Sequence, residues 1–465
     1  MSPSIDRAVH TKIRRSSLWS GILTLILLGL GSPFSALCGE DYEREPINYD
    51  TATPENPISR LQAALEEGAV SLSYEANTGY LSSLLQALEV PVSSQTLVFS
   101  KTSLQRNRIT PRSPRALYFN DDVYVGYCQD GDVLELSVAD PNLGGVFYTL
   151  DQKAEKATLV RQNDHCLTCH SSNNTKGVPG HLVRSVYVDQ SGFPIFSMGT
   201  HRIDHSSPLE KRWGGWYVTG THGDQKHLGN LVMTGTKQKE PVDNSAGQNV
   251  TSLDRRFKHS SYLTPHSDLV ALMVLEHQVE AHNLITKANF ETRQALHTEA
   301  GMNKALNEPP EHRWESTTTR IRNTADRLVK YLLFCDEAPL HGRLTGTSSY
   351  ADEFSQWGPR DEQGRSLRDF DLERRLFKYP CSYLVYSKSF DSLPGEVKEV
   401  VYRKLWDILT ATGPQKDYKH LSDTDRSSIL EILRSTKKDL PPYWYPSQSA
   451  ADTASSGGAP EQKID

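Results

Sequence analysis

The residues with the clearest chemical signal form a Cys-x-x-Cys-His pattern, Cys166-Leu167-Thr168-Cys169-His170. Two thiols three residues apart can bond both vinyl groups at one edge of a haem, and the histidine that follows then presents its imidazole to the iron. Six cysteines and sixteen histidines in 465 residues produce this order by chance with a probability of about 0.003. The pattern therefore predicts one covalent haem c, held by thioethers at Cys166 and Cys169 and by His170 on the iron.

Two other interpretations of the paired cysteines are weaker. A zinc ribbon needs a second paired cluster, whereas Cys335 and Cys381 are isolated from one another in the sequence. A thioredoxin-like dithiol needs a βαβ setting, and this motif instead follows a run of strand-like segments. Haem attachment is the interpretation that the spacing favours.

The second axial position of the iron decides between several chemistries. A methionine thioether or a second imidazole gives a six-coordinate electron-transfer haem, while an open position suits ligand binding or peroxide chemistry. Met198, which follows the apolar run 193–196, is the first candidate for the distal ligand. His222 and His201, in the segments that come next, are the alternatives.

The N-terminus has the pattern of an export signal. A basic segment over 12–15 precedes an apolar run over 18–30, and the small residues Ala36 and Cys38 follow. We expect residues 1–38 to be a signal peptide, with an uncleaved membrane anchor as the alternative. Covalent haem attachment takes place outside the bacterial cytoplasm, so the motif and the signal both predict a periplasmic protein, with peripheral or no membrane contact after cleavage.

Charge and cysteine content exclude two classes of protein. The chain has 51 Lys+Arg and 57 Asp+Glu, a net charge of −6, and a chain this acidic is a poor nucleic-acid binder. Six cysteines are about 1% of the residues, far below the density of a disulfide scaffold. No pairing among Cys128, Cys335 and Cys381 follows from the sequence.

Patterning divides the chain before the motif into a linker, a helical segment and a strand-rich domain. Residues 39–57 are acidic and proline-containing and predict a flexible linker. An N-terminal helical segment over 58–110 and a β-rich haem domain over 111–255 follow. Helical periodicity and short β-branched or aromatic runs predict these elements: helices 58–67 and 80–88, and antiparallel strands 117–127, 133–138, 145–150, 183–188, 194–198 and 213–219.

The C-terminal part has helical periodicity. We expect a helical domain over 265–446 and a disordered Ser/Ala/Gly-rich tail over 447–465. Its predicted helices are 267–306, as one helix or two, 317–334, 367–377, 395–410 and 423–435. The fold class is therefore α+β, an antiparallel β-rich haem-bearing domain followed by a helical C-terminal region.

Four residues of the long predicted helix form a carboxylate-histidine cluster, at Glu276, His277, Glu280 and His282. A di-iron site needs Glu-x-x-His and a zincin needs His-Glu-x-x-His, and neither spacing occurs here. We expect a solvated helix face with one buried histidine.

The attachment motif resembles that of c-type cytochromes, which implies thioethers at Cys166 and Cys169 and iron ligation by His170. The segments 213–220 and 439–444 look like those of large exported single-haem proteins known as cytochrome c domain proteins, a family with no established substrate. The strand-rich order of elements resembles haem-c sensor domains of the PAS or Cache kind.

These features predict a periplasmic c-type cytochrome that passes single electrons to or from a redox partner protein. A haem-based sensor or ligand-binding protein is the alternative. An enzyme such as a peroxidase is a third, for which the adjacent pair His201-Arg202 supplies a formal distal histidine and arginine. The oligomeric state does not follow from the sequence.

Overall fold

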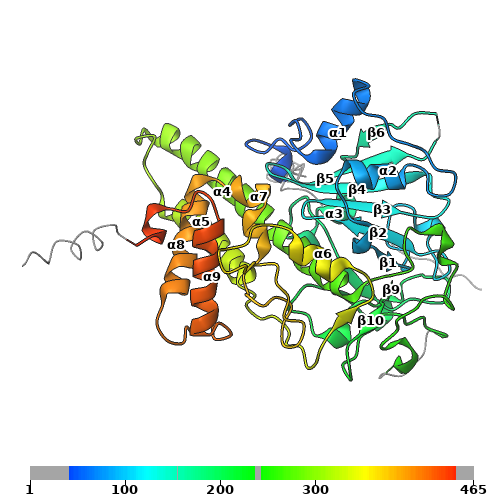
Figure 1. The fold of residues 1–465 in the computed structure, drawn as a ribbon. Helices are drawn as coiled ribbons and strands as arrows, with labels where there is room; N and C mark the ends of the chain where they lie inside the picture. The colour runs from blue at the N-terminus through cyan, green and yellow to red at the C-terminus, as the bar shows by residue number, and fades with distance from the viewer. Residues whose placement is uncertain (1–40, 154, 236–241, 447–465) are drawn as a thin grey trace, which may run out of the picture. The chain divides into compact units, whose positions relative to one another are not determined.

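The computed structural model describes residues 41–153, 155–235 and 242–446 (Figure 1). The strand-rich sequence before the motif supplies six strands of a seven-stranded antiparallel sheet, and a segment after the motif supplies the seventh. The strand order is β6-β5-β4-β3-β2-β1-β9. The strands are β1 Thr96–Val98, β2 Arg115–Phe119, β3 Val123–Tyr127, β4 Val133–Asp140, β5 Gly144–Asp151, β6 Leu159–Arg161 and β9 Trp216–Tyr217. Consecutive strands β1 to β6 are neighbours, which is the usual arrangement of strands that follow one another in sequence.

The two faces of this sheet have different partners. Tyr124 is part of the apolar core that contains side chains of the C-terminal helices. The next residue, Val125, is part of the apolar core that contains side chains of the N-terminal helices. Successive side chains of a strand point to opposite faces, so this alternation places one group of helices on each side. The N-terminal helices are α1 Pro57–Glu66 and α2 Leu81–Ala87.

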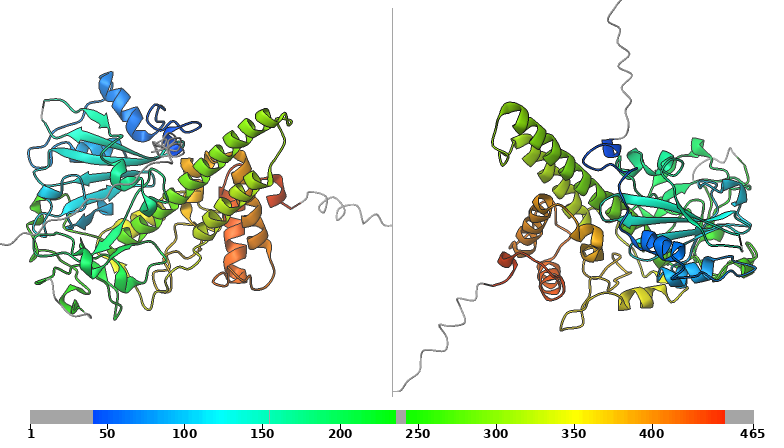
Figure 2. Two further views of the ribbon diagram at one scale, coloured as in Figure 1. Left: turned by 180° about the vertical axis from the view of Figure 1, so that it is seen from behind. Right: turned by 90° about the horizontal axis from the view of Figure 1, so that it is seen from above.

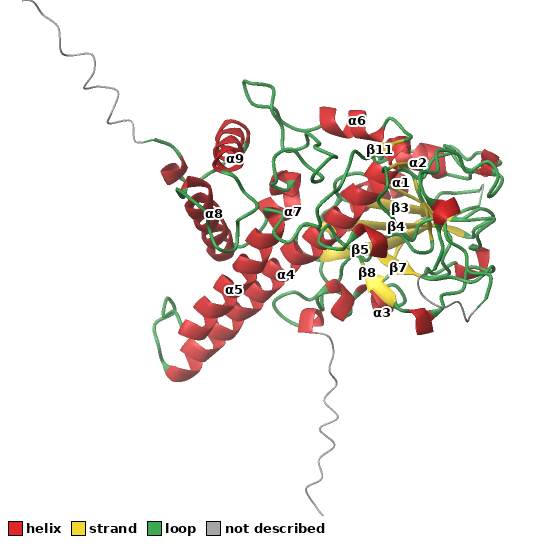
Figure 3. Ribbon diagram, turned by 90° about the horizontal axis from the view of Figure 1, so that it is seen from below, coloured by secondary structure: helices red, strands yellow, loops and turns green. Residues whose placement is uncertain are grey.

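A long helix, α4, crosses from the sheet to the C-terminal helices (Figure 2). It spans Leu269–Leu306, and the Asp268 side chain caps its first turn by accepting bonds from the N–H groups of Val270 and Ala271. It packs on β5 and on α5, α5 packs on α8, and α8 packs on α9 (Figure 3). These helices are α5 Glu315–Leu332, α8 Gly395–Thr410 and α9 Asp423–Thr436.

The remaining elements are short. A four-residue helix, α3, carries the motif, and the hairpin β7–β8 follows it along the chain. The short elements are α3 Leu167–His170, β7 Arg184–Val186, β8 Thr200–Arg202, β10 Gly220–Thr221, β11 Thr345–Gly346, α6 Tyr350–Gln356 and α7 Lys388–Asp391. The described residues from Tyr42 to 446 belong to one compact unit, which includes the described parts of the ranges 58–110, 111–255 and 265–446.

The predicted fold class, α+β with a C-terminal helical region, is confirmed. The predicted strand 117–127 is two strands, because the Asn120 side chain accepts bonds from the N–H groups of Asp122 and Val123 and turns the chain. The segment 194–198 ends in a 3-10 helix, and only Trp216 and Tyr217 of 213–219 are in a strand.

The predicted helix 367–377 is wrong, and the segment 267–306, predicted as one helix or two, is one. Residues 367–377 form turns instead of a helix, because Asp371 binds the N–H groups of Glu373 and Arg374 and a bridge joins Phe370 to Phe377. The segment 267–306 is one continuous helix from Leu269. The helices α8 and α9 lie where periodicity places them.

The flexible linker predicted over 39–57 is wrong for its described part. Tyr42, Ile47 and Tyr49 are buried, and the Tyr49 hydroxyl donates to the Gly145 carbonyl at 2.7 Å. The burial of these side chains, together with bonds from Arg161 to the carbonyls of Tyr49 and Ala52, holds this segment on the core. The predicted signal peptide, 1–38, and the predicted tail, 447–465, lie outside the described residues. No helix of the described part is both long and apolar enough to cross a membrane.

Candidate haem attachment site

The helix α3 brings the two thiols of the motif onto one face. Cys166 caps the helix, and the N–H groups of Cys169 and His170 donate to its carbonyl at 3.3 and 3.0 Å. Residues three apart on a helical turn are neighbours, so both sulfurs can reach one edge of a planar ligand. Cys166 is half-buried, Cys169 is exposed, and both are free thiols. Leu167 packs into the core beneath them.

The imidazole of His170 is held in one orientation. Its Nδ1 lies 2.9 Å from the Gly180 carbonyl oxygen, and because a carbonyl only accepts, Nδ1 carries the proton and Nε2 has the free lone pair. The Gly180 N–H in turn donates to the His170 carbonyl at 2.8 Å. Burial lowers the pKa of His170, which favours the neutral ring that a metal ligand requires.

The loop that supplies Gly180 is fixed between β5 and α4. The Gly145 N–H donates to the Pro179 carbonyl at 2.7 Å, and a side chain on Gly145 would lie 2.9 Å from the Gly180 nitrogen. At the other end of the loop, the Lys176 ammonium pairs with Glu280 on α4 at 2.8 Å. Glycine at 145 therefore allows the backbone of the loop to lie against the strand.

The sheet beneath the loop presents rings and small side chains. Tyr124, Ser137 and Phe147 are aligned across β3, β4 and β5, so they share one face. The Phe147 ring lies 4.8 Å from that of His170, centroid to centroid. This face thus contacts the histidine of the motif directly.

The same face carries an ion pair next to the motif. The Arg115 guanidinium lies over Gly126, where a Cβ would collide with it, and pairs with Glu135 at 2.6 Å. Both charges act on the pKa of Cys166, although burial is the larger effect and raises that pKa to about 11.

The carboxylate-histidine cluster of α4 is buried, so the expectation of a solvated face is wrong. Glu276, His277, Glu280 and His282 are each no more than 4% exposed. Each has a specific partner from another segment, which offsets part of the cost of burying it. The partners are Arg212 for Glu276, His205 for His277, Lys176 and Arg202 for Glu280, and Tyr124 for His282.

Two of these partnerships bear on the chemistry considered from the sequence. Arg202 donates to Glu280 at 2.5 Å, so it is not a free arginine beside His201 as a peroxidase site would need. Nδ1 of His205 lies 2.9 Å from Nδ1 of His277, and both rings stack on Tyr331. This stack connects the core near α4 to α5.

The three distal-ligand candidates lie in different segments. Met198 ends the 3-10 helix Phe196–Met198 and is half-buried, and His201 is exposed on β8. His222 is buried, and its Nε2 accepts the Asn249 N–H at 3.0 Å. The assignment of the distal ligand to Met198, His222 or His201 stays a prediction.

Two residues next to the motif have roles that the sequence does not indicate. Gly180 supplies the carbonyl that orients His170, and His181 follows it into the core. The Pro179-Gly180 pair indicates a turn at this point of the sequence. Its spacing from His170 does not indicate that the Gly180 carbonyl contacts the His170 ring.

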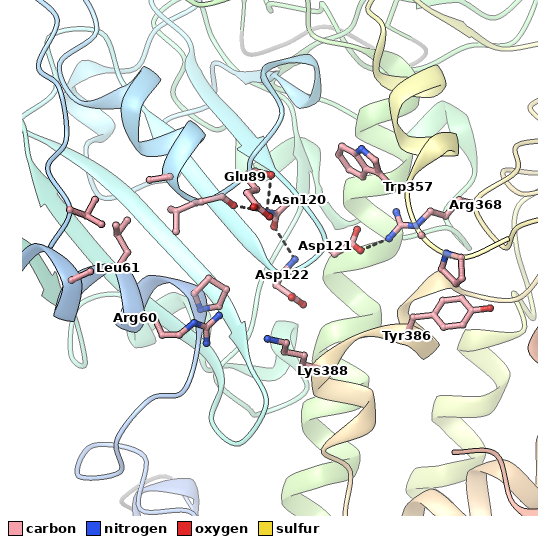
Figure 4. Close-up of a pocket in the computed structure, with 17 residues that line it drawn as sticks. Arg60, Leu61, Glu89, Asn120, Asp121, Asp122, Trp357, Arg368, Tyr386 and Lys388 are labelled. Carbon is pink, nitrogen blue, oxygen red and sulfur yellow. Dashed lines mark hydrogen bonds and ion pairs between the residues drawn. The ribbon is translucent and has the colours of Figure 1, made fainter. Parts of the chain in front are cut away.

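A separate cavity of about 830 Å³ lies between α1, the β2–β3 turn and α7 (Figure 4). Its lining has neither cysteine nor histidine, so it is distinct from the attachment motif. Arg368 pairs with Asp121 on one side, and the exposed side chains of Arg60 and Lys388 lie near Asp122. Burial raises the pKa of Asp122 to about 6, against the opposing effect of these cations.

The other described cysteines are structural. Cys128, Cys335 and Cys381 are buried free thiols, and burial raises the pKa of each to about 12. A buried thiol with a raised pKa is unreactive. Within the described ranges no group of three or more His, Cys, Asp and Glu residues could hold a bare metal ion.

Comparison of the chain with known protein families, with curated proteins and with solved structures found no match. The function of the site must therefore be inferred from its own residues.

Proposed function

We propose that this protein is a periplasmic c-type cytochrome that carries one covalent haem and transfers single electrons. The observation that supports this most strongly is the bond from His170 Nδ1 to the Gly180 carbonyl. It leaves Nε2 as a free ligand at the end of a Cys-x-x-Cys-His motif whose two thiols are unpaired. A histidine ligand normally has such a partner for its second nitrogen.

In this proposal each residue of the motif has one role. Cys166 and Cys169 form the thioethers, and His170 Nε2 binds the iron. A bound haem supplies the Fe(III)/Fe(II) couple, and the protein tunes its potential through the axial ligands, burial and hydrogen bonds. The Gly180 carbonyl increases the basicity of His170, and Phe147 packs against its ring.

The exposure of Cys169 supports electron transfer with a redox partner protein. A haem edge bonded to an exposed thiol lies at the surface, where a partner can approach it. Electron transfer of this kind needs no general acid or base.

A haem-based sensor is the second candidate, and one observation favours it. The motif loop is joined to α4 by the Lys176–Glu280 pair, and α4 is joined to α5 through the ring of His277 on Tyr331. A displacement at the haem thus has a packed route to the helical region. A sensor of this kind also requires an open position on the iron that a ligand can enter.

The test is haem incorporation into the full chain, exported in a host that matures c-type cytochromes. We expect haem that stays bound after denaturing electrophoresis, and its loss in the variants Cys166→Ala and Cys169→Ala. Cys335→Ala is the matched control, because this thiol lies outside the motif, and it should retain the haem. Wild-type protein without covalent haem would overturn the proposal. Carbon monoxide binding to the reduced wild type would favour the sensor.

A further inference from the structure

The cavity of about 830 Å³ is formed by segments that are far apart in the sequence (Figure 4). One side consists of α1 and the C-terminal end of α2, and the other consists of the segment 357–359, Arg368 and the start of α7. The β2–β3 turn lies between the two sides. A concave site of this size between separate segments is the usual form of a small-molecule site. The haem proposal leaves this cavity without a role.

Three charged side chains meet in the cavity without pairing with one another. Arg60 from α1 and Lys388 from α7 point toward Asp122 (Figure 4). Neither cation forms an ion pair or a side-chain hydrogen bond with a described residue. The buried Oδ1 of Asp122 has no hydrogen-bond partner in the described part of the chain either. Buried polar atoms are almost always paired, so a partner for this oxygen must come from a bound molecule.

The turn that carries Asp122 is held in place by Asn120. The side-chain oxygen of Asn120 accepts the N–H groups of Asp122 and Val123 at 3.1 and 2.9 Å. Its side-chain nitrogen donates to the carbonyls of Leu88 and Glu89 at 3.0 and 3.2 Å, which joins the turn to the end of α2. The position of Asp122 is therefore set before a ligand binds, and this lowers the entropic cost of binding.

Asp121 and Arg368 compensate each other's charge at the edge of the cavity. The two side chains form an ion pair. The Arg368 guanidinium also lies between the rings of Phe354 and Tyr383, with centroid distances of 4.6 and 4.3 Å. This arginine is thus held by its own partners and is not available to a ligand.

The remaining charges favour an anion. Glu89 lies beside Asn120, away from Arg60 and Lys388 (Figure 4). Burial raises the pKa of Asp122 to about 6, so its carboxyl readily takes up a proton and can then donate to an anion. Two cations and one proton donor face the same point, and hydrogen bonds of this kind to a carboxylate are strong because they are charge-assisted.

The wall of the cavity next to these charges is aliphatic. Leu61 follows Arg60 on α1, and Val70, in the segment after α1, is 39% exposed. The aliphatic wall consists of Leu61, Ala64, Val70, Ala87 and Leu88. A ligand with an aliphatic chain would remove this apolar surface from water, which favours binding.

We propose that this cavity binds a small organic acid with an aliphatic chain. Arg60 and Lys388 pair with its carboxylate, Asp122 donates a hydrogen bond to it, and the chain covers the aliphatic wall. This ligand would be a second one beside the haem. The inference goes beyond the proposed function and does not depend on it.

The experiment measures the binding of octanoate to the full chain by isothermal titration calorimetry. We expect saturable binding of one octanoate near pH 5.5, and binding about tenfold weaker near pH 7.5, because Asp122 then loses the proton that it donates. The charged groups that face Asp122 are Asp121 in the same turn, Arg60 from α1, Lys388 from α7 and Arg368. In the wild type, acetate and octylammonium should bind much more weakly than octanoate, since one lacks the chain and the other has the opposite charge.

Four variants test the roles of the charged residues. Arg60→Gln and Lys388→Gln should each weaken octanoate binding about tenfold, because each removes a charge-assisted hydrogen bond. Arg320→Gln is the matched control, since this exposed arginine of α5 is outside the cavity, and it should bind octanoate as the wild type does. Asp122→Asn keeps a hydrogen-bond donor without a titrating proton, so its octanoate binding should not weaken as the pH rises.

A second pair of variants tests the aliphatic wall. Ala64→Glu places a charge on the wall and should abolish octanoate binding, whereas Ala63→Glu, on the same helix but outside the lining, should not. The inference is overturned if wild-type protein does not bind octanoate, if it prefers octylammonium, or if Arg60→Gln and Lys388→Gln bind octanoate as tightly as the wild type. Ordered water would then be the partner of Asp122. None of these outcomes bears on covalent haem, which tests the proposed function separately.

Discussion

Replacing Gly180 by alanine should disrupt the contact between the motif loop and α4. A Cβ at this position would lie 2.2 Å from Oδ1 and 3.1 Å from Cγ of Asn283, and 3.3 Å from Cβ of Thr175. Asn283 is buried between the loop and the helix, so it cannot move aside without releasing its two bonds to the His181 backbone. The structure therefore predicts a large effect from one added methyl group.

The magnitude follows from those two bonds. Each contributes about 1 kcal/mol net, and a buried group left unpaired costs about 1–3 kcal/mol. We expect Gly180→Ala to lower the free energy of unfolding by about 2–4 kcal/mol. Urea unfolding of the full chain, followed by circular dichroism and by tryptophan fluorescence, measures this value. Coincidence of the two transitions would justify the two-state treatment.

Two comparisons make the prediction specific. Gly177→Ala, in the same loop with a positive φ but nothing within 4 Å of the added Cβ, should cost about 1 kcal/mol. In an Asn283→Ala background the clash is gone, so Gly180→Ala should add less than about 1 kcal/mol. The reasoning is refuted if Gly180→Ala costs no more than Gly177→Ala, or if its cost is unchanged when Asn283 is absent.

Three further predictions concern the rest of the chain. Arg212→Met should lower the free energy of unfolding by about 3–5 kcal/mol, because the buried Glu276 carboxyl loses its partner and the Ser207 and His205 carbonyls lose a donor. Denaturant unfolding of the double variant with Glu276→Leu should recover the part of this loss that is due to Glu276. Because burial raises the pKa of Asp122 to about 6, the folded state keeps a proton that the unfolded state releases near pH 4. The contribution of Asp122 to stability should thus fall by roughly 2–3 kcal/mol as the pH rises from 4 through 6, and the pH dependence of unfolding in Asp122→Asn should lack this contribution. Gly301→Ala, in α4 with nothing within 4 Å, should raise the thermal midpoint, equivalent to about 0.5–1 kcal/mol, and an unchanged or lower midpoint would contradict the helix-propensity argument.

The polar residues of α4 explain why its periodicity was misleading. Glu276, Glu280 and His282 suggest an exposed face when the helix is considered alone, because charged residues are seldom fully buried. Their partners come from segments 60 or more residues away in sequence, such as Arg212 for Glu276 and Lys176 for Glu280. Burial is a property of those distant contacts, so local patterning has no information about it.

Local interactions account for what the sequence by itself determined. The Cys-x-x-Cys-His motif is defined by adjacent residues, the antiparallel meander follows from its turns, and α8 follows from apolar residues at helical spacing. The chemistry proposed for the motif therefore follows from the sequence alone.

The tertiary structure alone decided which residues surround that motif. The carbonyl of Gly180 orients His170, the amide of Asn283 clamps His181, and Phe147 lies against both rings. These contacts join a loop, a helix and a strand that are separated by tens to more than a hundred residues. The energies of these contacts depend on how the loop, the helix and the strand pack together. The spacing of residues along the chain does not predict that packing.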